Sequence, residues 1–397
     1  MTRVLMVTKS QMNRGSYMRL YPMAARLSES GYNVTLICPH EYSNPSIESR
    51  LINDNFRLIL LPRFKTETHY AGILLRAIFI VLHLSRKRYD ILHVSSPAFL
   101  DTWSVSMIGK LFKIPTVVDI DDLWGYTGNN DRSHFESAIE EFLIRSAISA
   151  ASRVTAISQY LKDRYDHLCS REIEILWNGI SEDDLFSISK RQARDTLIDE
   201  LGLEINVKLL LSQVLKEQEE TTIEAIELVR KKGFNIVSTI PGAITRHPAE
   251  KLLTNGKNVN STFLLPRVER KKFLEMLVAS DIVLFSMKNT EWERARLPVR
   301  LTEFLASGTP LLSVVFGESR RILDMTSYGP LLRELNTNSS AESLARSIVY
   351  YLSNAEELDK IADEASKFVL TNLTWEQVIS QLIGIYKDLK IECASTS

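Results

Sequence analysis

Short apolar runs alternate with amphipathic stretches along the first half of the chain. Each apolar run is five or six residues long and rich in Val, Ile and Leu, which is typical of strands buried on both faces. The predicted strands are Val4–Thr8, Asn33–Cys38, Arg57–Leu61, Asp90–Val94, Thr116–Ile120 and Arg153–Ile157. The amphipathic stretches predict helices at Tyr17–Ser30, Ala71–Arg88, Ala98–Phe112, His134–Ala150 and Ser158–Leu168. This alternation predicts an α/β fold with a doubly wound parallel sheet.

The same pattern begins again after a polar and charged segment at residues 181–206, which contains one short helical stretch and is the best candidate for a linker. The second set of predicted strands is Lys208–Ser212, Asn235–Ile240, Ser261–Leu265, Asp281–Phe285 and Pro310–Val315. The second set of predicted helices is Glu217–Lys232, Arg270–Ser280, Val299–Ser307, Ala341–Leu352 and Ala355–Leu370. We therefore predict two Rossmann-like domains, residues 1–184 and 185–373, with a hinge near residues 183–205.

A further helix is predicted at Thr374–Lys390, after the second sheet is complete. Thr374 and Gln377 have the spacing of a capping box. Trp375, Ile379, Ile383 and Tyr386 recur on one face of this helix, so it must pack against another element.

Composition and charge exclude several classes of protein. The 48 basic and 49 acidic residues give a net charge of −1, and neither half has the positive excess that nucleic-acid binding requires. The three cysteines are far apart, which favours reduced thiols and a cytoplasmic location. The longest apolar run, 71–84, is interrupted by Arg76 and is shorter than the ~20 residues of a bilayer span.

Several stretches together resemble one protein family. They are Asn13–Ser16 before the first helix, Asp90–Ser96, Val117–Trp124, Arg153–Ser158 with Trp177–Ile180, and Leu297–Pro310. In this order they resemble the retaining nucleotide-sugar glycosyltransferases of the GT-B fold, in group 1 (family 4-like). The most specific part is Leu297–Pro310, which resembles the family's donor motif. The resemblance also implies that the last helix, 374–397, crosses back onto the N-terminal domain.

The resemblance implies the reaction and its partners. A sugar would move from a nucleotide-diphosphate sugar, UDP- or GDP-linked, to a hydroxyl of a sugar or lipid-linked acceptor, with retention. No metal or other cofactor would be needed, and the product would be a cell-surface polysaccharide or glycolipid. Two other readings remain: a non-catalytic sugar-nucleotide-binding subunit and a nucleotide-sugar 2-epimerase.

The donor motif supplies the first candidate residues. The resemblance implies that Glu303, which follows Pro298, accepts hydrogen bonds from the donor ribose. Arg300 stands where relatives carry Lys, and it would hold the diphosphate or form a surface pair. The family's more usual second glutamate would be residue 295, which is Ala, so Glu291 or Glu293 would take its place at the sugar.

The phosphate-binding positions depart from the family pattern. Relatives carry a glycine, an arginine and a lysine after the first strand of the second domain, whereas residues 211–218 contain only Lys216 as a cation. Arg267 follows a proline where glycine is usual. Diphosphate binding would therefore fall to Lys216, Arg267 and Arg300. Gly15 and Ser16 precede a helix and would offer backbone N–H groups to a phosphate, unless they form an ordinary turn.

Three carboxylates follow one predicted strand. Asp119, Asp121 and Asp122 lie where ligands bind in parallel sheets, and we predict that at least one of them is catalytic or contacts the sugar or acceptor. Their mutual repulsion would raise at least one pKa. His93 on the neighbouring strand is either a structural histidine or an acceptor contact.

One helix suggests a membrane partner. The helix at Ala71–Arg88 ends in Arg86, Lys87 and Arg88, so it could dock on the inner face of a membrane. The alternative is that its apolar side is buried in the core.

Overall fold

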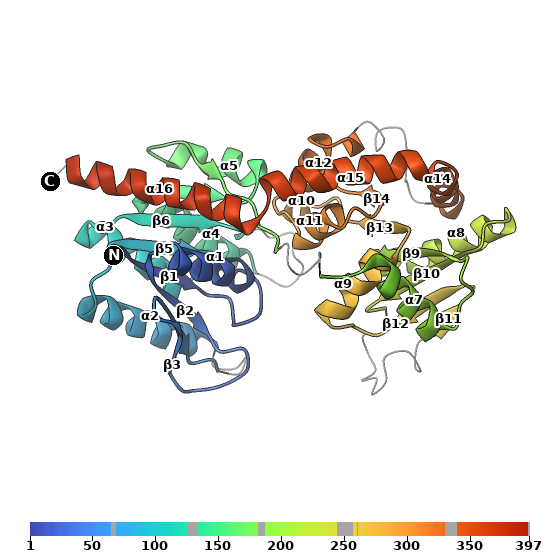
Figure 1. Ribbon diagram of the computed structural model, residues 1–397. Coiled ribbons are helices and arrows are strands. Elements are labelled where there is room, and N and C mark those ends of the chain that lie inside the picture. Colours follow the sequence, from blue (N-terminus) through green and yellow to red (C-terminus); the bar gives the residue numbers. More distant parts are fainter. Residues whose placement is uncertain are drawn as a thin grey trace. The chain divides into compact units, whose positions relative to one another are not determined.

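The computed structural model describes residues 1–64, 69–125, 133–181, 187–243, 257–259, 261–329 and 340–395. The chain forms two compact units (Figure 1). Unit 1 comprises Met1–Gly179, Ala295–Leu297 and Trp375–Ser397, and unit 2 comprises Ile180–Arg294 and Pro298–Thr374. The predicted boundary at residue 184 lies outside the described residues.

Unit 1 contains an eight-stranded sheet in the order β3-β4-β2-β1-β5-β6-β7-β8. Its strands are β1 (Arg3–Thr8), β2 (Asn33–Pro39), β3 (Glu48–Asn53), β4 (Phe56–Leu61), β5 (Ile91–Ser95), β6 (Thr116–Ile120), β7 (Arg153–Ala156) and β8 (Glu174–Ile175). Its helices are α1 (Tyr17–Glu29), α2 (His69–Arg86), α3 (Leu100–Phe112), α4 (His134–Ala150), α5 (Gln159–Tyr165), the 3₁₀ helix η2 (Asp166–Leu168) and α16 (Trp375–Ser395). All pairings are parallel except β3 with β4, which confirms the predicted sheet.

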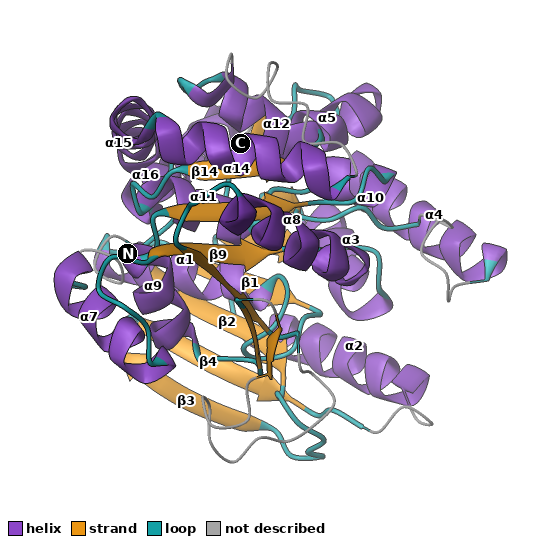
Figure 2. Ribbon diagram, turned by 90° about the vertical axis from the view of Figure 1, so that its right-hand side faces the viewer, coloured by secondary structure: helices purple, strands orange, loops and turns teal. Residues whose placement is uncertain are grey.

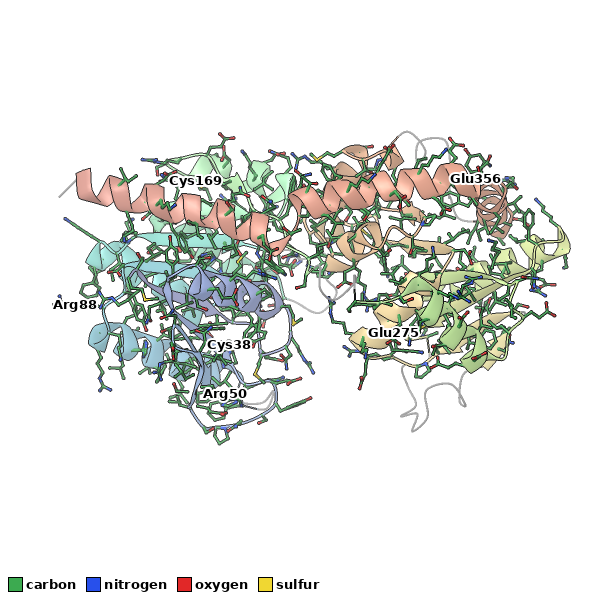
Figure 3. The ribbon with its side chains drawn as sticks, viewed as in Figure 1. Cys38, Arg50, Arg88, Cys169, Glu275 and Glu356 are labelled. Carbon is green, nitrogen blue, oxygen red and sulfur yellow. The ribbon has the colours of Figure 1, made fainter. Side chains whose placement is uncertain are left out.

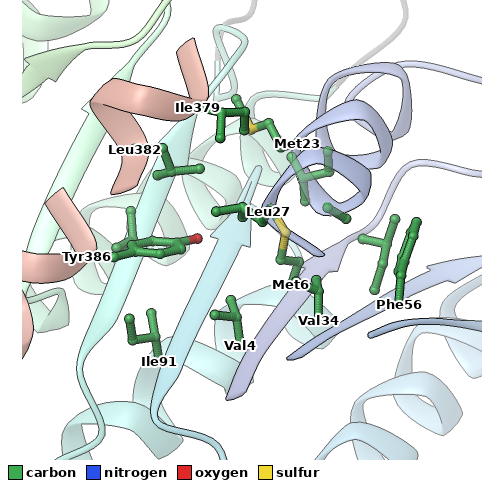
Figure 4. Packing of buried hydrophobic residues seen from close by; sticks show 14 of the residues in the cluster. Val4, Met6, Met23, Leu27, Val34, Phe56, Ile91, Ile379, Leu382 and Tyr386 are labelled. Atoms are coloured by element: carbon green, nitrogen blue, oxygen red, sulfur yellow. The ribbon is translucent and has the colours of Figure 1, made fainter. Parts of the chain in front are cut away.

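Alternating side chains of β1 build two cores on opposite faces of this sheet. Val4 and Met6 belong to one cluster with residues of α1 and α16 (Figure 4). Leu5 and Val7 belong to a second cluster with Ile80 of α2 and others. Because successive side chains of a strand point to opposite faces, α1 and α16 cover one face of the sheet and α2 and α3 cover the other.

Helix α16 packs within unit 1, although it is the last element of the chain. Trp375, Ile379 and Tyr386 lie in the same core cluster as Met23 and Leu27 of α1. Polar contacts add to this packing: Arg26 pairs with Glu376, and the Lys390 Nζ donates to the Thr2 hydroxyl at 2.8 Å. The apolar face predicted from the sequence is therefore the one that is buried.

Unit 2 contains a six-stranded sheet in the order β11-β12-β10-β9-β13-β14. Its strands are β9 (Lys208–Gln213), β10 (Ile236–Pro241), β11 (Lys257–Val259), β12 (Thr262–Leu265), β13 (Ile282–Ser286) and β14 (Leu311–Val314). Its helices are α7 (Lys190–Leu201), the 3₁₀ helix η3 (Lys216–Gln218), α8 (Glu219–Lys231), α9 (Arg270–Ala279), α10 (Glu291–Arg294), α11 (Val299–Ala306), α12 (Gly317–Asp324), α14 (Ala341–Ser353) and α15 (Ala355–Asn372). Only the short edge strand β11 is antiparallel.

Much of the segment predicted as a hinge is the helix α7. The Ser189 hydroxyl caps its first turn, and Gly202 ends it in the left-handed region with a φ of 63°. Ala193, Leu197 and Ile198 are buried, and Arg194 binds the Ala279 carbonyl and Asp281. The helix is highly charged with few apolar positions, which is why its sequence reads as a linker.

Cys38 and Cys169 are free thiols (Figure 3). Burial raises the pKa of Cys38 to about 12. The side chain of Cys393 lies outside the described part of the structure. Among the helices described here, none has the length and hydrophobicity needed to cross a membrane.

Candidate active site

The strand order defines one favoured binding position in each sheet. In unit 1 the chain runs from β1 to β2 and β4 on one side, then returns to β5 on the other side of β1. In unit 2 it runs from β9 to β10 and β12, then returns to β13 beside β9. Ligands of parallel α/β sheets bind at such switch points, outside the carboxyl ends of the strands. The expected positions are therefore the ends of β1 and β5 in unit 1, and of β9 and β13 in unit 2.

A chain of hydroxyl and carboxyl groups occupies the switch point of unit 1. The hydroxyl oxygens of Ser16 and Ser96 are hydrogen-bonded at 3.0 Å. The Ser96 hydroxyl donates to Asp121 Oδ1 at 2.6 Å, and the Ser16 N–H donates to the Ser10 hydroxyl at 3.1 Å. Gly15 has a φ of 51°, and a Cβ there would lie 2.8 Å from the Ser10 Oγ. The loop before α1 therefore requires glycine at this position.

Asp119 is held in a buried ion pair. It is inaccessible to solvent, and it accepts two hydrogen bonds from Arg19, at 2.8 and 3.1 Å, and one from the Thr155 hydroxyl at 2.7 Å. Arg19 also donates to the carbonyls of Leu176 and Trp177 and to the Asn178 side chain. Burial would raise the pKa of Asp119, but the charge and hydrogen bonds of Arg19 lower it. These contacts support a structural role for Asp119.

The pKa values of Asp121 and Asp122 are raised, whereas that of Asp119 is lowered. Burial and the nearby Asp119 raise the pKa of Asp121, although hydrogen bonds from Ser16 and Ser96 oppose the shift. Burial and the charge of Asp121 raise the pKa of Asp122 to about 6. Both carboxyl groups are only partly exposed. Both shifts favour the protonated form of these carboxyl groups, which lie at the edge where parallel sheets bind ligands.

Two cations lie close enough to Asp122 to oppose the rise in its pKa. The charges of Arg296 and Lys9 lower the pKa of Asp122. The Lys9 ammonium lies 3.6 Å from the centroid of the Phe99 ring and 3.2 Å from that of Trp124, which fixes it by cation–π attraction. Neighbours hold the segment around Arg296: the Ser158 hydroxyl donates to the Ala295 carbonyl at 2.5 Å.

His93 is part of the core of unit 1. It is inaccessible to solvent, and its Nδ1 lies 2.7 Å from the Tyr386 hydroxyl. Burial lowers the pKa of His93 to about 4, so the imidazole is neutral at physiological pH. This placement supports the structural alternative for His93.

Glu303 lies among basic side chains in unit 2. Helix α11 begins after Pro298, and Glu303 on it is 4% exposed and ion-paired with Arg270. Arg300 is one turn earlier on the same helix, and its guanidinium carbon lies 5.1 Å from the centroid of the Phe273 ring. Glu303 and Arg267 are the charged neighbours of Arg300.

Cations gather at the carboxyl edge of the second sheet. Lys216 follows β9, and Arg267 and Arg270 follow β12. All three residues are exposed. Lys288 follows β13 and pairs with Glu217 at 2.7 Å. This edge can therefore offer several positive charges to an anionic ligand.

Glu291 and Glu293 lie on the short helix α10, between β13 and α11. Both are partly buried. The end of α10 is packed tightly, because a Cβ at Gly317 would lie 2.1 Å from the Arg294 carbonyl oxygen. Within the described ranges, no group of three or more His, Cys, Asp or Glu side chains is arranged to hold a metal ion.

Four residues of these sites escaped the sequence prediction: Lys9, Arg19, Ser96 and Arg270. Arg19 could have been found, because it shares the spacing of Met23 and Leu27 on the apolar face of α1. A charged residue on such a face needs a buried partner. Ser96 and Lys9 become significant only once the strand order is known.

Family models match both halves of the chain. The model described as Glycosyltransferase Family 4 matches residues 15–184, and the one described as Glycosyl transferase-like matches residues 222–384. No curated protein sequence matches the chain significantly.

Solved structures are similar along the whole chain. The sucrose-phosphate synthase of Thermosynechococcus elongatus has a TM-score of 0.68 at 11% identity, covering 99% of this chain and 100% of its own. A glycosyltransferase of Rickettsia africae has a TM-score of 0.64 at 16% identity and 98% coverage of each chain. The HepE protein of Anabaena, in complex with UDP and glucose, has a TM-score of 0.63 at 14% identity, covering 98% of this chain and 100% of its own.

The two doubly wound sheets and these matches define a glycosyltransferase with the GT-B fold. Within that class, residues 15–184 match the family 4 model, in agreement with the predicted resemblance to the group 1 (family 4-like) enzymes. The predicted fold class and family are thereby confirmed.

Proposed function

We propose that this enzyme transfers a sugar from a nucleoside-diphosphate sugar, UDP- or GDP-linked, to an acceptor hydroxyl with retention and without a metal ion. Unit 2 would bind the donor and unit 1 the acceptor. The acceptor would be a sugar or a lipid-linked sugar used for a cell-surface polysaccharide or glycolipid. The enzyme would work in the cytoplasm, in peripheral contact with the inner face of the membrane.

The observation that carries this proposal is the placement of Glu303. Its carboxylate is almost fully buried, yet it lies beside Arg270 and near Arg300 and Arg267, at the edge where parallel sheets bind ligands. A carboxylate in this position can accept hydrogen bonds from both ribose hydroxyls. The surrounding guanidinium groups can bind the diphosphate by charge-assisted hydrogen bonds.

The same cations suit the chemistry of transfer. When the bond between the anomeric carbon and the diphosphate oxygen breaks, negative charge develops on the leaving phosphate. Positive groups aimed at that oxygen stabilise the transition state. The acceptor oxygen attacks the anomeric carbon on the same face, and its proton passes to an oxygen of the leaving diphosphate. Lys216, Arg267 and Arg300 are the side chains that we assign to this charge. The UDP-glucose complex of HepE, which shares the fold, supports a nucleotide-sugar donor.

Unit 1 would supply the acceptor contacts. Asp121 and Asp122 are partly exposed at the switch point of its sheet, whereas Asp119 is sealed by Arg19. We therefore assign acceptor binding to Asp121 and Asp122, and phosphate contact to the Gly15 backbone, because the Ser16 N–H already donates to the Ser10 hydroxyl. Glu291 and Glu293 would contact the donor sugar.

The test uses donor binding and turnover by three proteins. Wild type, Glu303→Gln and Glu356→Gln are titrated with UDP-, GDP- and ADP-sugars, and nucleoside diphosphate release is measured. Glu356 is the matched control, because it is an exposed glutamate on α15 of the same unit (Figure 3). Hydrogen bonds to a charged group contribute about 1.5–3 kcal/mol, so Glu303→Gln should weaken donor binding about 10- to 100-fold.

The control should bind as wild type does. Equal donor affinity for Glu303→Gln and wild type would contradict the assignment of Glu303. Circular dichroism of the variant shows whether the loss of the Arg270 ion pair has disturbed the fold. Tight donor binding without release or transfer for any sugar would contradict the proposed reaction but not the donor site.

A further inference from the structure

Helix α2 is apolar on both of its sides. Its inner side packs on the sheet through Ile80, with Phe79 and Leu84 against the same core cluster. Its outer side carries five aliphatic residues that are each 42–51% exposed: Leu74, Leu75, Ile78, Val81 and Leu82. A helix that is hydrophobic all round is normally covered on all sides. The outer side of α2 therefore requires a partner.

The neighbouring helices extend this apolar surface. Helix α3 packs beside α2, and α4 packs beside α3 (Figure 2). Leu111 and Phe112 at the end of α3 are 74% and 67% exposed, and Phe135 and Phe142 on α4 are 73% and 66% exposed. These three helices carry eleven of the 21 exposed large hydrophobic side chains in the described part of the chain. The patch exceeds the scattered apolar exposure of an ordinary soluble surface.

The exposed charges at the ends of α2 and α3 have one sign, whereas α4 carries the partly exposed Glu136 and Glu141, the latter paired with Arg145. Helix α2 contains no acidic residue, and the single acidic residue of α3, Asp101, is buried in an ion pair with Arg76. The exposed charges at the ends of the two helices are all basic, namely Arg86, Lys87, Arg88, Lys110 and Lys113.

A hollow adjoins the end of α2, at the amino edge of the sheet and opposite the acceptor site. Its charged lining consists of Arg3, Arg57, Arg86, Lys87, Arg88 and Asp54. Five of these six groups are cations, and Arg88 projects from the edge of unit 1 (Figure 3). The hollow is therefore suited to an anionic group.

We propose that α2, with the ends of α3 and α4, docks on a bilayer that contains anionic lipids. The aliphatic side chains would enter the boundary between headgroups and acyl chains, and the basic hollow would take a lipid phosphate. The exposed aliphatic side of α2, with three consecutive basic residues at the end of the helix, matches such a surface in both respects. This inference deepens the proposed function, because it assigns the peripheral membrane contact to named elements.

The experiment is co-sedimentation of the full chain with lipid vesicles. Wild type should bind vesicles that contain phosphatidylglycerol, and should not bind pure phosphatidylcholine vesicles. The triple variant Arg86→Gln/Lys87→Gln/Arg88→Gln should partition about 100-fold less, because each basic side chain near an anionic surface contributes about fivefold. Leu74→Gln/Ile78→Gln should reduce partitioning at least about tenfold through the loss of apolar contact.

Matched controls come from unit 2. Arg191→Gln/Lys231→Gln/Lys232→Gln removes the same net charge from exposed positions, and Ile205→Gln removes an 81% exposed aliphatic side chain. Both should bind vesicles as wild type does. The proposal would be overturned if the α2 triple variant and its control bound vesicles equally. It would also be overturned if wild type formed a stable dimer and Leu74→Gln/Ile78→Gln dissociated that dimer, because the apolar side of α2 would then be a protein interface.

Donor binding distinguishes this proposal from the proposed function. The α2 variants should bind nucleotide sugars with unchanged affinity, because the altered residues belong to unit 1 and none of them is among the residues that we assign to the donor. If wild type binds vesicles but no nucleotide sugar, the proposed function fails while the docking surface stands. If it binds donor but not anionic vesicles, the docking surface fails alone.

Discussion

The Arg19–Asp119 ion pair offers the sharpest test of how unit 1 is stabilised. Arg19 is 4% exposed and Asp119 is 0% exposed, and Arg19 makes five hydrogen bonds to Asp119, Leu176, Trp177 and Asn178. The variant Arg19→Met keeps the length of the apolar stem but leaves the Asp119 carboxylate buried with only the Thr155 hydroxyl. Breaking a buried pair from one side costs about 3–5 kcal/mol, because a charge is left without compensation.

A second ion pair on the same helix provides the control. Arg26 pairs with Glu376, but their side chains are 28% and 57% exposed. An exposed pair contributes about 1 kcal/mol or less, so Arg26→Met should have little effect. The double variant Arg19→Met/Asp119→Leu should recover part of the stability that Arg19→Met loses, because it leaves no buried charge.

The assay is urea unfolding at several pH values, monitored by tryptophan fluorescence. The free energy of unfolding is taken from the transition that Arg19→Met shifts. The charge of Arg19 lowers the pKa of Asp119, so the stabilisation is present above the ordinary pKa of 3.8 and is lost as the pH falls below it. The difference between wild type and Arg19→Met should therefore shrink in acid. If Arg19→Met costs no more than Arg26→Met at neutral pH, the reasoning is refuted.

Three further predictions concern single positions. The pKa of Asp122 is raised to about 6 in the fold, so the free energy of unfolding falls as the pH rises and this carboxyl group ionises. Asp122→Asn cannot ionise and should remove this pH dependence. At pH 8 it should therefore stabilise the protein, by no more than about 3 kcal/mol. Gly179→Ala should destabilise unit 1 by about 1–3 kcal/mol in thermal unfolding, since its Cβ would lie 2.5 Å from the Trp375 ring. Gly317→Ala should cost unit 2 as much or more, because its φ is 58° and its Cβ would meet the Arg294 carbonyl.

The two glycine predictions have matched controls. Gly384→Ala adds a methyl group to α16 in open space and should stabilise slightly. Gly202→Ala has a positive φ but no neighbour within 4 Å, so it separates backbone strain from collision. Equal melting temperatures for Gly317→Ala and Gly202→Ala would show that the collision is relieved at no cost. An unchanged pH profile in Asp122→Asn would show that another group titrates.

The sequence predicted the central strands well, because their physical signal is local. Strands such as β1 and β6 are buried on both faces, so most of their residues are apolar. The edge strand β3 pairs with β4 alone, and almost all of its residues are exposed. It therefore has no apolar run to detect. Helix α7 was predicted only as a short helical stretch within a linker, since only three of its residues are buried.

The sites could be predicted only where one segment carries them. The donor motif around Glu303 lies within one short segment, and so do the three carboxylates at the end of β6. The sequence pattern and the family resemblance are therefore enough to locate both groups of residues. The partner of Asp119 lies 100 residues away on α1, and Ser16 and Ser96 are 80 residues apart. Such pairs depend on strand order and on the packing of α1, which the alternation of strands and helices does not specify.

The position of α16 has a consequence for how the chain is made. The largest core of unit 1 joins β1 and α1 to residues between Trp375 and Leu389. A ribosome therefore synthesises all of the chain between α1 and Trp375, including unit 2, before this core can close. Until then Met23, Leu27 and their neighbours lack their final cover, so nascent unit 1 is a natural client for chaperones while unit 2 is being synthesised.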